Sequence, residues 1–424
     1  MTAPDQLRIT CPEDILGFIT HSLGYWPALS LVAITLQGKR LGATLRVDLP
    51  DDGAGGQGGS PAAARFARSV ASYLEADEEA DGSLLAFFTG VDGDGSAVAV
   101  LLQELEHALA EAGMPVRDAW LIGTDYWRNA YCSDPSCCGT PGRPIDEIRN
   151  SRLNAEMVFR GSTVGSAPGD PAPAPRCEDA AVLAAEEDWA QLFAGRRRER
   201  PQFTEALEIW TRVLQAPPGQ EIPAGLAGYL RATLCVPAWR DAVLVMAAAG
   251  AAAADRGAED FGVFDDDSTP LRGSTAPAPD RARQGPRLPL PLPPLDGFPP
   301  QALPGGAANG AGGVPVEVPA YGEVLLGLAP PVPDWSLMGR LERVLVQLAV
   351  SGGEAGAAAL TGRGWIEWCR GKGSYADALF SLAEEEYPGY RLAELLAELV
   401  RRGTLCGWAG RKDSAWQKFA ADVA

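Results

Sequence analysis

Histidine is nearly absent from this chain of 424 residues, which contains only His21 and His107. Because histidine is the side chain that most readily exchanges protons near neutral pH, a hydrolase with a Ser–His–acid triad is poorly supported. His107 falls on the polar face of a predicted helix, so we expect it to be solvated. His21 falls near the end of the first predicted helix, where a positive imidazole is favourable. We expect a capping role for His21, and a role as a general base is the alternative.

Positive charge is also scarce. The chain has 55 Asp and Glu residues against 36 Lys and Arg residues, which gives a formal net charge of -19 at pH 7. A surface of this sign repels phosphate backbones and anionic lipids, so we expect neither nucleic acid nor a membrane as a partner. The one basic run, residues 196–200, falls between two predicted helices and is interpreted as a solvated loop.

Long apolar runs are missing as well. The longest, residues 242–254, is rich in alanine and too short to cross a bilayer. The polar first eight residues lack the charged and then apolar regions of a signal peptide. The eight cysteines are scattered along a long chain, which is typical of reduced thiols. These features together predict a cytoplasmic protein.

Residues 1–166 alternate between helix and strand periodicity. Residues 10–13 have the spacing of a capping box and precede a helical pattern that ends at Gly24. Alternating strands and helices predict a layered α/β domain, and a hairpin predicts that its sheet is mixed. Residues 156–163 are interpreted as a further edge strand. The predicted strands are 29–36, 41–47, 84–88 and 116–122, and the predicted helices between them are 61–74 and 97–112.

After the proline-rich stretch that follows residue 166, the apolar residues recur with the spacing of a helix. Residues 178–250 and 334–424 predict the two parts of an all-helical region. Residues 251–333, rich in Ala, Gly and Pro, predict a disordered linker or insertion, in which the run 287–294 could act as a polyproline ligand. The segment 371–379, followed by Pro388, resembles half of a tetratricopeptide repeat, so we expect a helical hairpin that is partly tetratricopeptide-like.

The most distinctive stretch runs from Trp127 to Cys138, just after the predicted strand 116–122. Ligand sites of α/β sheets favour the loops beyond the carboxyl ends of strands, so the place is suggestive. We expect a ligand or partner site here, to which two residues of the hairpin also contribute. The candidate residues are Arg46, Asp48, Trp127, Arg128, Cys132, Asp134, Cys137 and Cys138.

Three interpretations of this stretch stay open. Zinc could bind Cys132 together with Cys137 or Cys138, with a further ligand from afar such as Cys11, Cys177 or His21. A reactive or redox thiol could have its pKa lowered by Arg128. In the structural interpretation, which the residues favour, the aromatic rings pack over the sheet edge, Arg128 pairs with a carboxylate and the cysteines fill small buried volumes. We therefore assign no metal, no cofactor and no catalytic residue.

Two motif matches are interpreted as turns. Residues 53–58 fit G-x-G-x-x-G, but Asp51 and Asp52 would repel a pyrophosphate, so a flexible loop is favoured. Residues 92–96 begin like a calcium loop, but Gln103 stands where a glutamate is needed. We interpret them as a strand-to-helix turn capped by Ser96.

Several segments resemble an uncharacterised actinobacterial family, known as domain of unknown function 4192. The resemblance covers most of the chain apart from the Ala/Gly/Pro insertion, and it implies kinship without catalytic residues to carry over. The segments are 11–16, 23–27, 30–32, 45–50, 127–138, 240–242 and 373–393.

The residues favour a non-catalytic cytoplasmic binding or regulatory protein, with another protein or a small molecule as its partner. The alternatives are a thiol-dependent enzyme or redox protein that uses Cys132, Cys137 or Cys138, and a zinc-stapled structural domain.

Overall fold

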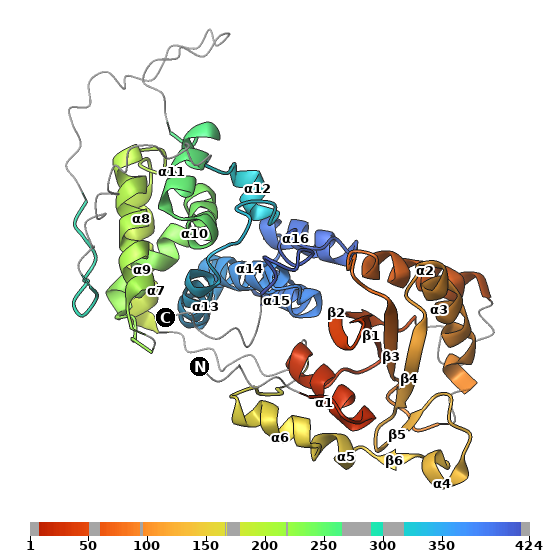
Figure 1. The fold of residues 1–424 in the computed structure, drawn as a ribbon. Helices are drawn as coiled ribbons and strands as arrows, with labels where there is room; N and C mark the ends of the chain where they lie inside the picture. The colour runs from red at the N-terminus through yellow and green to blue at the C-terminus, as the bar shows by residue number, and fades with distance from the viewer. Residues whose placement is uncertain are drawn as a thin grey trace, which may run out of the picture. The chain divides into compact units, whose positions relative to one another are not determined.

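The computed structural model describes residues 8–50, 60–93, 96–165, 167, 179–217, 219–264, 290–299 and 318–416. The chain divides into two compact units, Met1–Asp170 and Pro171–Ala424. Figure 1 shows a sheet with helices in the first unit and helices alone in the second.

A six-stranded mixed sheet forms the framework of the first unit, in the order β2-β1-β3-β4-β5-β6. Among the described strands only β3 and β4 run parallel, and the other neighbours are antiparallel. The predicted mixed sheet is therefore confirmed. The strands are β1 (Ser30–Gln37), β2 (Arg40–Asp48), β3 (Gly82–Phe88), β4 (Val116–Ile122), β5 (Tyr126–Asn129) and β6 (Arg143–Pro144).

Helices cover both faces of this sheet. Because successive side chains of a strand point to opposite faces, Leu31 and Ala33 of β1 pack on one side and Val32 and Ile34 on the other. The first side is covered by α2 (Ser60–Leu74) and α3 (Ala99–Glu111), and the second by α1 (Pro12–Leu23) and α5 (Asp146–Arg149). Burial on both faces explains why β1 is continuously apolar.

The start of α1 differs from the predicted capping box. The helix begins at Pro12, its N-cap is Cys11, and no side chain caps it. Thr10 instead donates to Oδ2 of Asp14 from both its backbone N (3.0 Å) and its Oγ1 (2.8 Å). The predicted end is confirmed, because Gly24 adopts a left-handed conformation (φ 88°) and its N–H donates to the carbonyl of Thr20.

The expected edge strand over residues 156–163 is wrong, because this part of the chain forms the helix α6 (Arg152–Phe159). The N-cap Ser151, whose side chain accepts a hydrogen bond from the N–H of Asn154, starts the helix upstream of that range. Leu153 and Met157, four residues apart, then lie on one buried face, and α6 packs against α1. The capping signal and the helical spacing outweigh the β-branched residues near its end.

The described residues of the second unit form helices and connecting segments, without a strand, as the helical spacing of residues 178–250 and 334–424 predicts. Its single core cluster includes the fully buried Phe193, Trp210, Tyr229 and Trp365. Its helices are α7 (Ala180–Phe193), α8 (Arg200–Gln215), α9 (Ala224–Leu234), α10 (Pro237–Ala249), α11 (Ala251–Asp260), α12 (Tyr321–Leu325), α13 (Trp335–Ala349), α14 (Gly353–Cys369), α15 (Gly373–Glu386) and α16 (Arg391–Arg401).

The predicted disorder of residues 251–333 is wrong where the structure describes them. Residues 251–264, 290–299 and 318–333 are ordered and pack against the helical core, while 265–289 and 300–317 lie outside the described residues. A face of small side chains lets α11 pack closely: a Cβ added to Gly257 would lie 1.8 Å from a ring carbon of Tyr321. Composition alone does not reveal this contact, because the partner ring is 64 residues away in the chain.

Within the described residues no single helix is long and apolar enough to cross a membrane. The pair α9 and α10 passes that test by length and composition only when the two are taken together across a bend of 103°.

Candidate functional site

The distinctive cysteine-containing stretch begins on a strand rather than in a loop. Trp127 and Arg128 lie on β5, and the chain then forms the β5–β6 loop, residues 130–142, with a short helix α4 (Pro135–Cys138) inside it. The loop returns to the sheet at Gly142, whose φ is 124°. A Cβ at this position would lie 2.6 Å from the carbonyl oxygen of Trp127, so the return requires glycine.

Side chains from β4, β5 and α3 hold the start of this loop. The Oδ1 of Asn129 accepts from the backbone N–H groups of Tyr131 (2.9 Å) and Cys132 (3.1 Å). The Nδ2 of Asn129 donates to Oδ1 of Asp118 at 2.5 Å, and the Tyr131 hydroxyl donates to Oε1 of Glu106 at 2.6 Å. Burial raises the pKa of the Tyr131 phenol, and the Glu106 carboxylate raises it further. The phenol therefore stays protonated and serves as a donor.

Arg128 is partly buried on the α3 face of the sheet, where it pairs in register with Leu121 of β4. The expected ion pair with a carboxylate is not found among its described contacts. Instead, Nη2 donates to the backbone carbonyl of Cys132 at 3.3 Å. Its Nε is buried and has no hydrogen-bond partner among the described residues. Leaving a buried donor without a partner costs free energy of folding. The Nε of Arg128 is such a donor.

Trp127 faces the opposite side of the sheet and belongs to the core under α1, with 2% of its surface exposed. The guanidinium of Arg143 stacks on it, 4.7 Å from the ring centroid. Arg143 in turn forms ion pairs with Glu13 and, at 2.7 Å, with Glu147. Trp127 therefore packs into the core and does not line a surface that a ligand could reach.

The remaining loop candidates have different environments. Asp134 is exposed and caps α4: its Oδ1 accepts from the N–H (2.8 Å) and the Oγ (2.7 Å) of Ser136, and these bonds lower the pKa of the carboxyl group. Cys138 is buried and Cys132 is partly buried. The side chain of Cys137 lies outside the described residues. Within the described part of the chain, no three His, Cys, Asp or Glu side chains gather to hold a metal ion.

Arg46 and Asp48 do not belong to this site. They form an ion pair of 2.5 Å on β2, at the other edge of the sheet. The order β2-β1-β3-β4-β5 separates them from Arg128 by four strand spacings, or about 19 Å. The expected grouping with the β5–β6 loop is therefore wrong, because the sheet order places the hairpin and the loop at opposite edges.

The two histidines have opposite environments. The expectation of a capping role for His21 is wrong: the ring is fully buried, its Nε2 donates to Oδ1 of Asn154 at 2.7 Å, and its Nδ1 lies 2.9 Å from Oγ of Ser162. His21 thus joins α1 to α6. The predicted exposure of His107 is confirmed, and it lies 3.5 Å from Glu111.

Asp118, Asn129 and Glu106 were not recognised from the sequence as residues that hold the β5–β6 loop. An asparagine two residues before a turn was the available signal, because its side chain readily accepts from the following N–H groups. Ser96 begins the 3₁₀ turn Ser96–Val98, and Val98 is the N-cap of α3, so the cap predicted at Ser96 is wrong.

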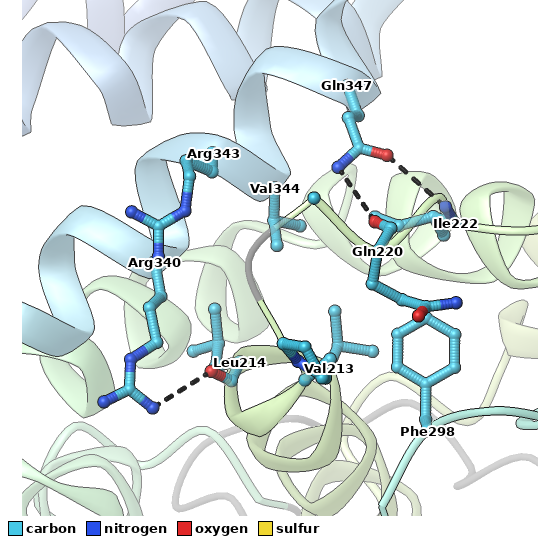
Figure 2. A pocket seen from close by; sticks show the side chains of 12 residues that line it. Val213, Leu214, Gln220, Ile222, Phe298, Arg340, Arg343, Val344 and Gln347 are labelled. Atoms are coloured by element: carbon cyan, nitrogen blue, oxygen red, sulfur yellow. Dashed lines mark hydrogen bonds between the residues drawn. The ribbon is translucent and has the colours of Figure 1, made fainter.

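A small pocket lies in the helical unit, between the end of α8, the chain that follows it, and α13. Its volume of about 30 Å³ leaves space for roughly two water molecules. Gln347 accepts from the N–H of Ile222 (3.3 Å) and donates to the carbonyl of Gln220 (3.4 Å), and Arg340 donates to the carbonyl of Leu214 at 3.5 Å. Figure 2 shows Phe298 on one side of this pocket and the α13 side chains on the other.

These features define a two-unit protein, with a mixed-sheet α/β unit that carries a hydrogen-bonded edge loop and a helical unit. The chain belongs to the family described as Domain of unknown function (DUF4192), whose model matches residues 12–257 and 334–405. The match spans both units and omits residues 258–333. No curated protein and no solved structure matches the chain.

Proposed function

We propose that this protein is a non-catalytic, cytoplasmic binding or regulatory protein. In this proposal the β5–β6 loop of the α/β unit binds a ligand or a partner, and the helical unit contacts another protein. The observation that carries the proposal is the half-exposed Tyr131 ring on a loop held by Asn129 and Glu106. A loop fixed before binding loses little conformational entropy when a partner docks on it.

The chemistry of the loop suits recognition. Tyrosine and arginine are enriched where proteins bind one another, because each combines a large contact area with hydrogen-bond donors. Tyr131 is 47% exposed, and the partly buried Arg128 keeps an unpaired Nε beside it in the sequence. A partner, whether it is a protein or a small molecule, would pack against the exposed Tyr131 ring.

The test is affinity capture coupled to quantitative mass spectrometry, with the full chain as bait. We expect a partner that is enriched by the wild-type protein and lost with Tyr131→Ala. Tyr131→Phe keeps the ring but removes the hydrogen bond to Glu106, so it separates the contribution of the ring from that of the bond that holds the loop. Lys39→Ala, in the exposed turn between β1 and β2, is the matched control and should retain the partner. Equal capture by all four proteins, together with turnover of a metabolite, would refute the proposal.

A thiol-dependent activity is the second candidate. It is favoured by the position of Cys132, which is partly buried and whose carbonyl accepts from the Arg128 guanidinium at 3.3 Å. This candidate requires Cys132 to react with iodoacetamide much faster than a free thiol of ordinary pKa, and slow alkylation would exclude it. One zinc per chain, lost in Cys132→Ser, would instead favour the zinc-stapled alternative.

We also propose that the α14–α15 hairpin is tetratricopeptide-like. The second helix carries Ala376 and Phe380 in the spacing A-x₃-F, followed by Pro388, as that repeat does. Both side chains are buried. The helices approach closely at Gly364, where an added Cβ would lie 2.4 Å from the Phe380 ring. This close packing supports the repeat-like geometry, and such hairpins are a common means of contacting another protein.

A further inference from the structure

An inserted segment lies against the outside of the helical unit. Residues 290–299, with the sequence Leu-Pro-Leu-Pro-Pro-Leu-Asp-Gly-Phe-Pro, are called the strap below. The strap falls in the part of the chain that the family match omits, whereas the helices beneath it fall within the match. A segment outside the family match therefore covers a surface of the matched helical core.

The strap is anchored by alternating apolar side chains. Pro293 and Phe298 are buried, and Leu290 and Leu295 pack against the core cluster. Phe298 is the strongest anchor, with 6% of its surface exposed and its ring beside Val213 at the end of α8. By contrast, Leu292 is 63% exposed on the outer side of the strap.

Backbone contacts fix the direction and register of the strap. The Nε of Arg212 on α8 donates to the carbonyl of Pro299 at 2.9 Å, and its Nη2 donates to that of Phe298 at 3.5 Å. The N–H of Phe298 donates to the carbonyl of Leu295 at 3.1 Å, which closes a tight turn with Gly297 at φ 83°. This turn directs the Phe298 ring inward.

The start of α9 is shaped to accept the proline ring. A Cβ added to Gly225 would lie 3.1 Å from Cγ of Pro294, so the absence of a side chain there leaves room for the strap. The exposed Leu292 lines an open hollow together with Pro201 and Thr204 from the first turns of α8. Thus the strap follows α8 from near its first turn to its last, with α9 alongside.

These contacts combine the elements of proline-rich peptide recognition: extended prolines on an apolar surface, an aromatic anchor in a pocket, and a side chain that binds the peptide's carbonyl groups. We infer that the surface formed by α8, α9 and the pocket before α13 is a binding site for proline-rich segments, occupied in this chain by its own strap. A partner segment of the same chemistry, with leucines and prolines before a Gly-Phe anchor, binds by displacing the strap. The inference rests on the proposed role of the helical unit in contacting another protein.

Tethering makes the strap a strong competitor. A segment joined to its own site acts at an effective concentration in the millimolar range, so a free peptide binds poorly while the strap is seated. Weakening the strap without changing the site should therefore expose the surface to a peptide in solution. Phe298→Ala removes the anchor, and Gly297→Ala strains the turn that directs it.

The experiment measures binding of a fluorescent peptide of residues 286–300 to the full chain by anisotropy. We expect weak binding to the wild-type protein and roughly tenfold or more tighter binding to Phe298→Ala, with Gly297→Ala between them. Leu292→Ala, on the exposed side of the strap, is the control and should behave as wild type. Adding Arg212→Ala to Phe298→Ala, or replacing the phenylalanine of the peptide by alanine, should abolish the gain.

Equal binding of the peptide by wild type and folded variants would overturn the inference, as would no binding by any of them. If Phe298→Ala does not fold, as judged by circular dichroism, Gly297→Ala decides, because it leaves the core side chains in place. The Tyr131 capture experiment probes the other unit, so its outcome is independent of this one. If the peptide does not bind but the partner is still captured, only the role of the strap is refuted.

Discussion

At the scale of the residue, the second unit contains an arginine with 1% of its surface exposed. The Nε of Arg231 donates to Oε2 of Glu186 at 2.6 Å, its Nη2 donates to the carbonyl of Gly352 at 2.6 Å, and its Nη1 donates to that of Leu348. A buried charge is tolerated when its donors are satisfied in this way. The guanidinium thus joins α9 to α7 and to the end of α13.

Arg231→Ala should be among the most destabilising single changes in the chain. Removing one member of a buried pair leaves Glu186 and two carbonyls without their partner, which costs about 3–5 kcal/mol. The free energy of unfolding from urea titration measures this cost. Arg402→Ala breaks an exposed pair with Glu398 and should change stability by less than about 0.5 kcal/mol. If both variants lost a similar free energy of unfolding, the stabilising role given to the buried Arg231 would be wrong.

The described thiols differ sharply in their expected reactivity. Burial raises the pKa of Cys235 to about 12, and the Glu186 carboxylate adds to this rise, while Cys369 is fully buried and its pKa is also raised. The thiolate is the reactive form, so both should resist alkylation at pH 8. Cys132, which is partly buried, should be modified before either of them.

Pulsed iodoacetamide labelling followed by peptide mass spectrometry measures this order. Labelling in urea is the control, because all thiols should then react at similar rates. Modification of Cys369 at the rate of Cys132 in the native protein would show that the second unit opens readily.

At the scale of the element, the carboxylate of Asp14 links the first turn of α1 to the start of α6. Asp14 accepts from the backbone N and the Oγ1 of Thr10, and its Oδ1 accepts from the N–H of Leu153 at the start of α6. Burial by itself would raise the pKa of this carboxyl group, but the hydrogen bonds outweigh it and the pKa is lowered. His21 joins the same two helices further along, through Asn154.

This lowered pKa predicts the pH dependence of stability. A carboxyl group whose pKa is lower in the folded state stabilises the fold above its unfolded pKa of 3.8, and the stabilisation is lost as the pH falls through the folded value. Asp14→Asn should therefore lose about 1–2 kcal/mol at pH 7. The loss of stability below pH 4 should be smaller in the variant than in the wild type.

Urea titrations of both proteins between pH 2.5 and pH 7 test this prediction. Glu111→Gln, on the exposed end of α3, is a control that should leave the fall in stability at acidic pH unchanged. Parallel curves for Asp14→Asn and the wild type would show that Asp14 contributes nothing to acid unfolding.

At the scale of the whole molecule, each unit has a core of its own. The two clusters on either side of the sheet contain residues of the first unit, and the large helical cluster contains residues of the second. A domain of this size with its own core can fold alone. We expect Met1–Asp170, expressed by itself, to give a dispersed amide NMR spectrum and one cooperative thermal transition. A collapsed spectrum would mean that this unit needs the rest of the chain.

The periodicity of the sequence determined most of the elements. Strand β4 lies at the predicted residues, and β1, β2, β3 and the large helices lie within a few residues of prediction. The spacing of apolar residues, the helix caps and the turns that predict these elements are all local properties of the sequence. The strands β5 and β6 were missed, since short strands carry too few residues for a period. The disorder expected from composition failed where Phe298 and Tyr321 contribute to a core far away in the chain.

What only the tertiary structure decided is which residues meet. The sequence determined that Arg46 and Arg128 are charged residues of an α/β unit, but the strand order alone placed them at opposite edges of the sheet. Likewise, the buried His21 has partners more than 130 residues away, and the Pro299 carbonyl of the strap binds Arg212 of α8, 87 residues before it. Local periodicity carries no information on such pairings, because they arise from the joint burial of apolar faces from distant parts of the chain.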